Sequence, residues 1–243
     1  MDAPFPALVA ALRILAAALL LPAGVAAAAD LPLKRATGPM VEVTSGEETL
    51  WQEQGIAPDD AGAVQAFLKR LGESRPQIVR VPGRPGVFLA SDFVGRTGED
   101  YGRCLFLLQS AKGEVRELGR TRRASDAYTM KPVVFVGGGR TVVLAELATE
   151  YSWGVRVYEI AGDAILDLGA IDAAVPGEAG AEDPTPFAKV SIEGGRLVVR
   201  FDKDLVLGTL KEDPPVARKP VVFRQDDSGF VRVEGTKRAK GSR

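Results

Sequence analysis

From residue 77 onward, short apolar runs alternate with turn-forming residues, and this pattern restricts the possible fold more than any other feature of the chain. Gly, Pro and Asp interrupt the apolar runs about every 8 to 15 residues, as expected of strands joined by tight turns. The pattern predicts hairpins in which residues 104–110 pair with 114–119, 133–136 with 141–147, 155–160 with 164–168, 188–192 with 197–202, and 221–224 with 230–234. A further strand pair is predicted at residues 78–81 and 87–93.

The turns and strand faces favour the same fold class. The turns at residues 137–139, 194–195 and 226–229 contain glycine or aspartate, which tolerate the backbone conformations of tight hairpins. Residues 188–192 alternate apolar and polar, which predicts one buried face, whereas residues 105–108 and 141–144 are apolar on both faces and are expected in central strands. We therefore expect a mainly β fold, an antiparallel hairpin meander of propeller-like or sandwich form; a barrel is a third way for such a meander to curl.

A short helical element is predicted ahead of the strands. Ser45 and Glu48 have the spacing of a capping box, and a helix from there is expected to run to about residue 54. A second helix places Val64, Phe67, Leu68 and Leu71 on one apolar stripe, which a neighbouring element must cover. The region from 30 to 76 is thus expected to be a polar leader followed by a helical pair, and residues 77–235 an antiparallel β domain.

The first 29 residues have the pattern of a secretory signal peptide. One arginine, Arg13, precedes an apolar run at residues 14–21, and an alanine-rich stretch ends before Asp30, which suits an A-x-A cleavage site. A membrane-spanning helix needs roughly 20 apolar residues, and this run is shorter and is interrupted by Pro22 and Gly24. We expect the signal peptide to be removed and the mature protein to be soluble, periplasmic or secreted, and not membrane-spanning. Residues 236–243 are expected to form a disordered basic tail.

Composition excludes several classes of function. The chain has 31 basic and 32 acidic side chains, so it carries no large field of one sign and a nucleic-acid partner is not expected. It contains no histidine, which excludes Ser-His-Asp and Cys-His catalysis and histidine-ligated zinc. Its single cysteine, Cys104, cannot form an intramolecular disulfide and is expected to be a buried apolar side chain. We expect no cofactor and no metal site, and no residue is assigned a catalytic role.

The strongest candidate binding residues are Glu150, Tyr151 and Trp153, at a predicted connection between two strands. In an extended segment, Tyr151 and Trp153 share a face and could stack on a sugar ring or anchor a partner protein, with Glu150 as a hydrogen-bonding group. The alternative is that Trp153 packs in the core and Tyr151 covers its rim. The exposure of Trp153 distinguishes these two interpretations.

Carboxylates provide the alternative chemistry. Without histidine, a glycosidase-like hydrolase could still use two carboxyl groups, and Glu146, Glu150, Asp202 and Asp204 are the candidates near apolar strands. The oxygen-rich turns at residues 202–204 and 226–229 do not match a calcium-binding loop and are interpreted as turns. Residues 172–186 and 209–219 are expected to be long, irregular and mobile connections.

These observations favour an exported, non-catalytic binding protein that recognises an envelope protein or a glycan; an inhibitor or immunity-type protein is one concrete form of it. Two alternatives stay open. One is a carboxylate-dependent envelope hydrolase, and the other is a structural scaffold subunit. No motif identifies a family.

Overall fold

The computed structural model describes residues 30–37, 41–42, 48–71, 77–94, 102–124, 127–149, 152–178, 180–209, 211–212 and 214–233. The predicted signal peptide and the predicted basic tail lie outside these ranges. The described chain is mainly β, with antiparallel pairing throughout, so the predicted fold class is confirmed. All five predicted hairpins and the additional strand pair are present, although several strands are longer than expected.

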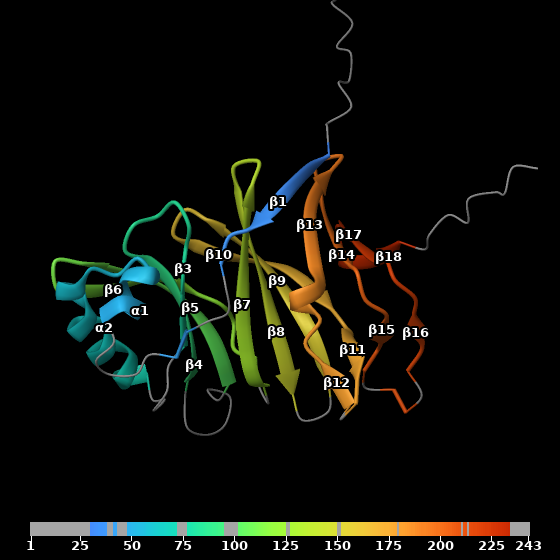
Figure 1. The fold of residues 1–243 in the computed structure, drawn as a ribbon, viewed down its shortest axis with the longest axis horizontal. Helices are drawn as coiled ribbons and strands as arrows, with labels where there is room; N and C mark the ends of the chain where they lie inside the picture. Colours follow the sequence, from blue (N-terminus) through green and yellow to red (C-terminus); the bar gives the residue numbers. More distant parts are fainter. Residues whose placement is uncertain are drawn as a thin grey trace, which may run out of the picture.

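Nine strands form a barrel-like sheet that is nearly closed (Figure 1). Their order is β10-β9-β8-β7-β1-β13-β14-β17-β18. The strands are β1 (Leu31–Arg35), β7 (Ala127–Gly137), β8 (Arg140–Thr149), β9 (Trp153–Ala161), β10 (Ala164–Ile171), β13 (Ala188–Glu193), β14 (Arg196–Phe201), β17 (Val221–Asp226) and β18 (Gly229–Val233). This arrangement is the barrel alternative, and it differs from both a propeller and a simple sandwich.

The two edge strands of the barrel-like sheet are not paired with each other. Every neighbouring pair from β10 to β18 is antiparallel, so strand direction alternates along the order, and the ninth strand runs parallel to the first. The two edge strands, β10 and β18, approach closely at Gly169 and Gly229 without forming a ladder. A cleft between unpaired backbone edges therefore remains at this seam.

A second sheet and two helices cover one side of the barrel-like sheet. The five strands, in the order β2-β3-β4-β5-β6, are β2 (Val41–Glu42), β3 (Gln77–Arg80), β4 (Val87–Val94), β5 (Gly102–Ala111) and β6 (Glu114–Arg120). Helices α1 (Glu48–Glu53) and α2 (Pro58–Leu71) cover its outer face, where Trp51, Val64 and Leu68 are buried (Figure 1). The predicted helical pair is thus present, with Val64 and Leu68 of the predicted stripe buried, whereas Ser45 of the predicted capping box lies outside the described residues.

Strands with two apolar faces lie where two cores meet. On β8, Val142 and Leu144 point into the barrel-like sheet, while Val143 and Ala145 pack against the five-stranded sheet. On β5, Leu105 and Leu107 face the barrel-like sheet, and the alternate residues of this strand face the helices. The prediction that these segments are central strands is confirmed. The helices, the five-stranded sheet and the barrel-like sheet therefore pack in that order.

Residues predicted to be irregular contribute additional strands. Residues 172–186, expected to be a mobile connection, contain β11 (Ala173–Gly177), β12 (Gly180–Glu182) and the 3-10 helix η2 (Thr185–Phe187). Strand β11 pairs with β15 (Leu205–Leu207), which pairs with β16 (Val216–Ala217) in the other segment that was expected to be irregular. The expectation of irregular structure was wrong here because these short strands pair with distant partners. The predicted polar leader likewise supplies β1 and β2.

Two sequence predictions concern single features of the described chain. Cys104 is fully buried against the helices, and burial raises the pKa of its thiol, as expected of an unreactive apolar side chain. Within the described ranges, no helix is both long and apolar enough to cross a bilayer.

Candidate functional site

Of the three predicted binding residues, the structure describes Trp153. Glu150 and Tyr151 lie outside the described residues. Trp153 is the first residue of β9 and is half-buried, which is intermediate between the core and surface interpretations. Thr209 fixes its backbone, because the Trp153 amide donates to Thr209 Oγ1 over 2.9 Å and Thr209 Oγ1 donates to the Trp153 carbonyl over 3.0 Å. The backbone of Trp153 is therefore held in a fixed position.

Strand register brings Trp153 to the same face as three polar side chains. Lys131 on β7 lies opposite Glu146 on β8, and Thr129 lies opposite Ala148, which in turn lies opposite Trp153 on β9. Alternate residues of a strand share a face, and Val142 and Leu144 of β8 point into the barrel-like sheet, so Glu146 also points inward. We call Thr129, Lys131, Glu146 and Trp153 the mouth, because they line the interior where β8 ends and β9 begins.

Glu146 is the unusual member of the mouth. Only 1% of the residue is exposed, and burial raises the pKa of its carboxyl group, as does the nearby Asp183 carboxylate. The Lys131 ammonium, 3.7 Å from Glu146 Oε2, opposes that rise. Thr129 lies close enough to favour the charged form slightly, yet among the described residues neither Thr129 Oγ1 nor Glu146 Oε2 has a partner in hydrogen-bonding geometry. The mouth thus holds two buried oxygens with unused hydrogen-bonding capacity.

Residues 183–187, which we call the cover segment, pack against β8, the strand that contains Glu146. The Asp183 carboxylate accepts hydrogen bonds from the Thr185 amide and hydroxyl, each over 2.7 Å, and this turn starts η2. Helix η2 contacts β8, and Thr185 is 1% exposed. The cover segment therefore places a second carboxylate, Asp183, near Glu146.

A small hollow lies on the outer surface of the same strands. It has a volume of about 130 Å³ and is lined by residues of β8, β9 and β10, among them Leu147, Trp153, Gly154 and Ala170. Gly154 is required there, because a Cβ atom at this position would lie 2.9 Å from the Ile171 carbonyl oxygen. Trp153 therefore borders both the mouth and this outer hollow.

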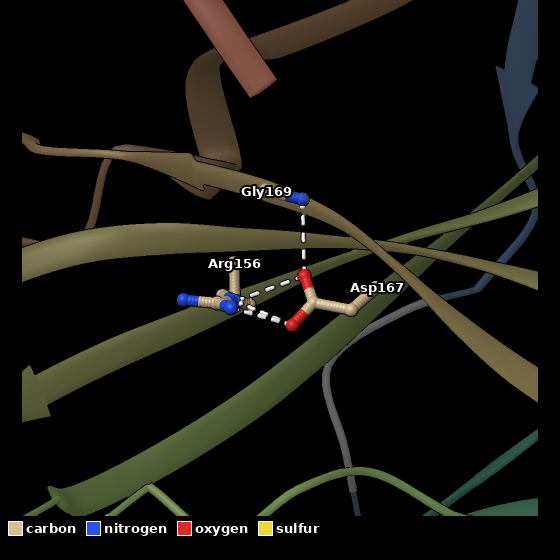
Figure 2. A network of polar contacts seen from close by, with 3 residues as sticks. All are labelled: Arg156, Asp167 and Gly169. Atoms are coloured by element: carbon tan, nitrogen blue, oxygen red, sulfur yellow. Dashed lines mark hydrogen bonds and ion pairs between the residues drawn. The ribbon is translucent and has the colours of Figure 1, made fainter. Parts of the chain in front are cut away.

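A larger, polar groove of about 520 Å³ lies at the seam between β10 and the β17–β18 turn. Figure 2 shows its central contact, in which Arg156 Nε and Nη2 bind the Asp167 carboxylate and the Gly169 amide donates to Asp167 Oδ1. The Arg156–Asp167 contact joins β9 to β10, and the Gly169 bond follows the bulge between Asp167 and Gly169. Because these charges compensate each other, the contact is explained by its structural role.

The other predicted carboxylates form ordinary surface contacts. Asp202 pairs with Lys189 over 2.5 Å, and Asp204 pairs with Arg218 over 2.6 Å. Asp226 accepts hydrogen bonds from the Ser228 amide and hydroxyl at the β17–β18 turn, so the interpretation of that segment as a turn is confirmed. In the part of the chain that the structure describes, no three acidic or cysteine side chains are placed to hold a metal ion.

Sequence reasoning found Trp153 and Glu146 but not the residues around them. Thr129 and Lys131 are missed because only the β7–β8 register aligns them with Glu146. Asp183 is missed because it lies in a segment that reads as flexible, although an aspartate two residues before a threonine is a local signal for a side-chain-bonded turn. No protein-family model, no curated protein and no solved structure matches this chain.

Proposed function

We propose that the protein is an exported, non-catalytic binding protein, and that its binding surface is the end of the barrel-like sheet around Trp153. The observation that carries this proposal is the state of Trp153 itself: it is half-buried, its backbone is fixed by Thr209, and it borders both the mouth and the outer hollow. Rigid, partly exposed tryptophans are common anchors in binding sites, because little conformational entropy is lost on binding. The proposed ligand is an envelope protein or a glycan.

A second exposed aromatic residue supports this location. Tyr128 is 57% exposed and forms the bulge in β7 opposite the end of β8. Strand β8 separates it from Trp153, so both residues lie at the same end of the sheet. Aromatic side chains with polar groups nearby suit both sugar rings and protein partners.

The proposal is tested with the mature chain, residues 30–243, as bait. Envelope extract and a glycan array are presented to the wild type and to Trp153→Ala, and any captured protein or glycan is then purified and its affinity measured. We expect Trp153→Ala to weaken binding by at least about tenfold, which is the scale of an interface anchor. Trp51→Phe is the control, because Trp51 of α1 is buried between the helices and the five-stranded sheet. Equal affinity of Trp153→Ala and wild type for the purified ligand would contradict this surface.

A carboxylate-dependent hydrolase is the second candidate, because Glu146 and Asp183 are a carboxylate pair in which one pKa is raised. A carboxylic acid that stays protonated can act as a general acid while a neighbouring carboxylate acts as the base. This function predicts that Glu146→Gln abolishes turnover of envelope glycans while the far-ultraviolet circular dichroism spectrum is retained. Unchanged turnover in Glu146→Gln would eliminate this candidate.

A further inference from the structure

The mouth contains a buried acid that is poorly compensated, and the segment covering it carries a like charge. Glu146 is almost fully buried, its Oε2 has no hydrogen-bond partner among the described residues, and Asp183 in the cover segment is close enough to disfavour its charged form. An ionised carboxylate in such a position is destabilising unless it gains water or a partner. Local opening of the cover segment would supply that water.

The charged groups that face Glu146 come from two elements. Lys131 on β7 is the compensating cation, and it is 3.7 Å from Glu146 Oε2 with half of its side chain exposed. Asp183, at the start of the cover segment, is the opposing anion. Strand β9 contributes Val155 and Trp153, and η2 contributes Thr185 and Phe187, none of which titrates in this range. A partly exposed ammonium at that distance compensates the buried charge only weakly.

The cover segment is held by local hydrogen bonds and by two bonds to distant residues, in which the Asp202 amide donates to the Phe187 carbonyl over 3.2 Å and the Arg35 guanidinium donates to the Pro186 carbonyl over 3.3 Å. Asp183 bonds to Thr185, the Phe187 amide donates to the Pro184 carbonyl, and the Ala188 amide donates to the Thr185 carbonyl. Opening of the segment by local unfolding breaks these bonds, so exchange of the three amides reports on it. The Phe187 ring packs against the core of the barrel-like sheet and the Lys203 ammonium lies 4.9 Å from its centroid, so opening must also release this partly buried ring.

We propose that Glu146 is a pH-sensitive latch: its neutral form keeps residues 183–187 closed over the mouth, and its ionisation releases them. This inference rests on the proposed function for its biological role, since opening would expose Glu146, Thr129 and Trp153 to the ligand. On loss of the proton to solvent, the two carboxylates repel each other, and the open state is favoured because it hydrates Glu146. Binding at the mouth is then stronger at neutral than at acidic pH.

The latch is tested without any ligand, by amide hydrogen exchange of the full mature protein from about pH 5 to about pH 9, with rates corrected to protection factors. The informative amides are those of Thr185, Phe187 and Ala188, each of which is hydrogen-bonded. If opening is linked to the loss of one proton, the protection factors of these amides fall by up to about tenfold per pH unit. They reach a plateau above the pKa that Glu146 has in the closed state.

Three variants make the result decisive. Glu146→Gln cannot ionise and should hold the three protection factors constant, whereas Glu182→Gln, which neutralises an exposed neighbouring carboxylate, should keep the wild-type pH dependence. Lys131→Met should move the fall in protection to higher pH, since it removes the compensating cation. Protection that is independent of pH in the wild type, or that falls equally in Glu146→Gln, would overturn the latch. Because exchange needs no ligand, failure of Trp153→Ala to weaken binding would leave this result intact and contradict only the proposed binding surface.

Discussion

At the scale of single residues, the mouth is defined by an unfavourable electrostatic environment. Glu146 is only 1% exposed, the cover segment packs against its strand, and its partner Lys131 is 3.7 Å away. Most buried charges in proteins are paired and fully hydrogen-bonded. A buried charge that departs from this rule lowers the free energy of unfolding, and the size of this loss depends on pH.

We predict that Glu146→Gln stabilises the protein at neutral pH. The pKa of Glu146 is raised in the folded state, so between the unfolded pKa and that raised value the folded protein binds more protons. Its stability therefore falls as pH rises through this window and remains lower above it, by about 1.4 kcal/mol for each unit of pKa difference. Urea unfolding of both proteins across this range should show the two curves diverging as pH rises. Curves that stay parallel would show that Glu146 has an ordinary pKa.

The residues of this site could be found only partly from the sequence. Trp153 and Glu146 stand out as an aromatic and a carboxylate in an apolar setting, and these properties are local. Their neighbours depend on the register between β7 and β8 and on the return of residues 183–187 to β8, and neither is encoded in a short window of sequence. The chemistry of single residues could therefore be predicted from the sequence, but their arrangement into a site could not.

At the scale of elements, β1 joins the two halves of the barrel-like sheet. Leu31–Leu33 pairs with β13, whereas Lys34 and Arg35 pair with β7, so a strand of five residues bridges two hairpin groups. Leu33 is its buried side chain and reaches the core inside the sheet. The hairpins were predicted because their partners are adjacent in sequence, whereas β1 was missed because both of its partners are distant and most of its residues are exposed.

We predict that Leu33→Asp lowers the free energy of unfolding by roughly 2–4 kcal/mol, because it places a charge in the apolar core. Leu31→Asp is the matched control on the same strand, since Leu31 is 47% exposed, and its effect should stay within about 0.5 kcal/mol. Chemical denaturation followed by circular dichroism measures both values. Similar losses for the two variants would mean that β1 contributes no buried contact.

The seam is a second element-scale feature, because β10 and β18 meet there without pairing. A Cβ atom on Gly169, which has a φ of +122°, would lie 3.0 Å from the Gly229 Cα atom. Gly169→Ala should therefore cost about 1–3 kcal/mol and increase amide exchange along both edges. Gly162→Ala is the control, because Gly162 also has a positive φ, +58°, but has open space around its Cα. If both variants lose equal stability, backbone conformation alone accounts for Gly169.

At the scale of the whole molecule, one continuous apolar interface joins the five-stranded sheet to the barrel-like sheet. Leu89, Leu105 and Leu107 from one sheet pack against Val134 and Val143 from the other, and all five are fully buried. Without the other sheet, each sheet would expose its apolar face to water, so the two sheets are expected to fold as one cooperative unit. The two-faced apolar strands indicated such layers from sequence, but their partners became known only with the topology.

We predict that Leu107→Ala, at this interface, lowers stability by about 2–5 kcal/mol and lowers a single melting transition without splitting it. Differential scanning calorimetry checks cooperativity directly, since the calorimetric and van't Hoff enthalpies agree for one unit. Val64→Ala, in the layer beneath the helices, is the comparison, because Val64 is equally buried but touches no residue of the barrel-like sheet core. Two separate transitions in Leu107→Ala would mean that the barrel-like sheet, and with it the mouth, folds without support from the second sheet.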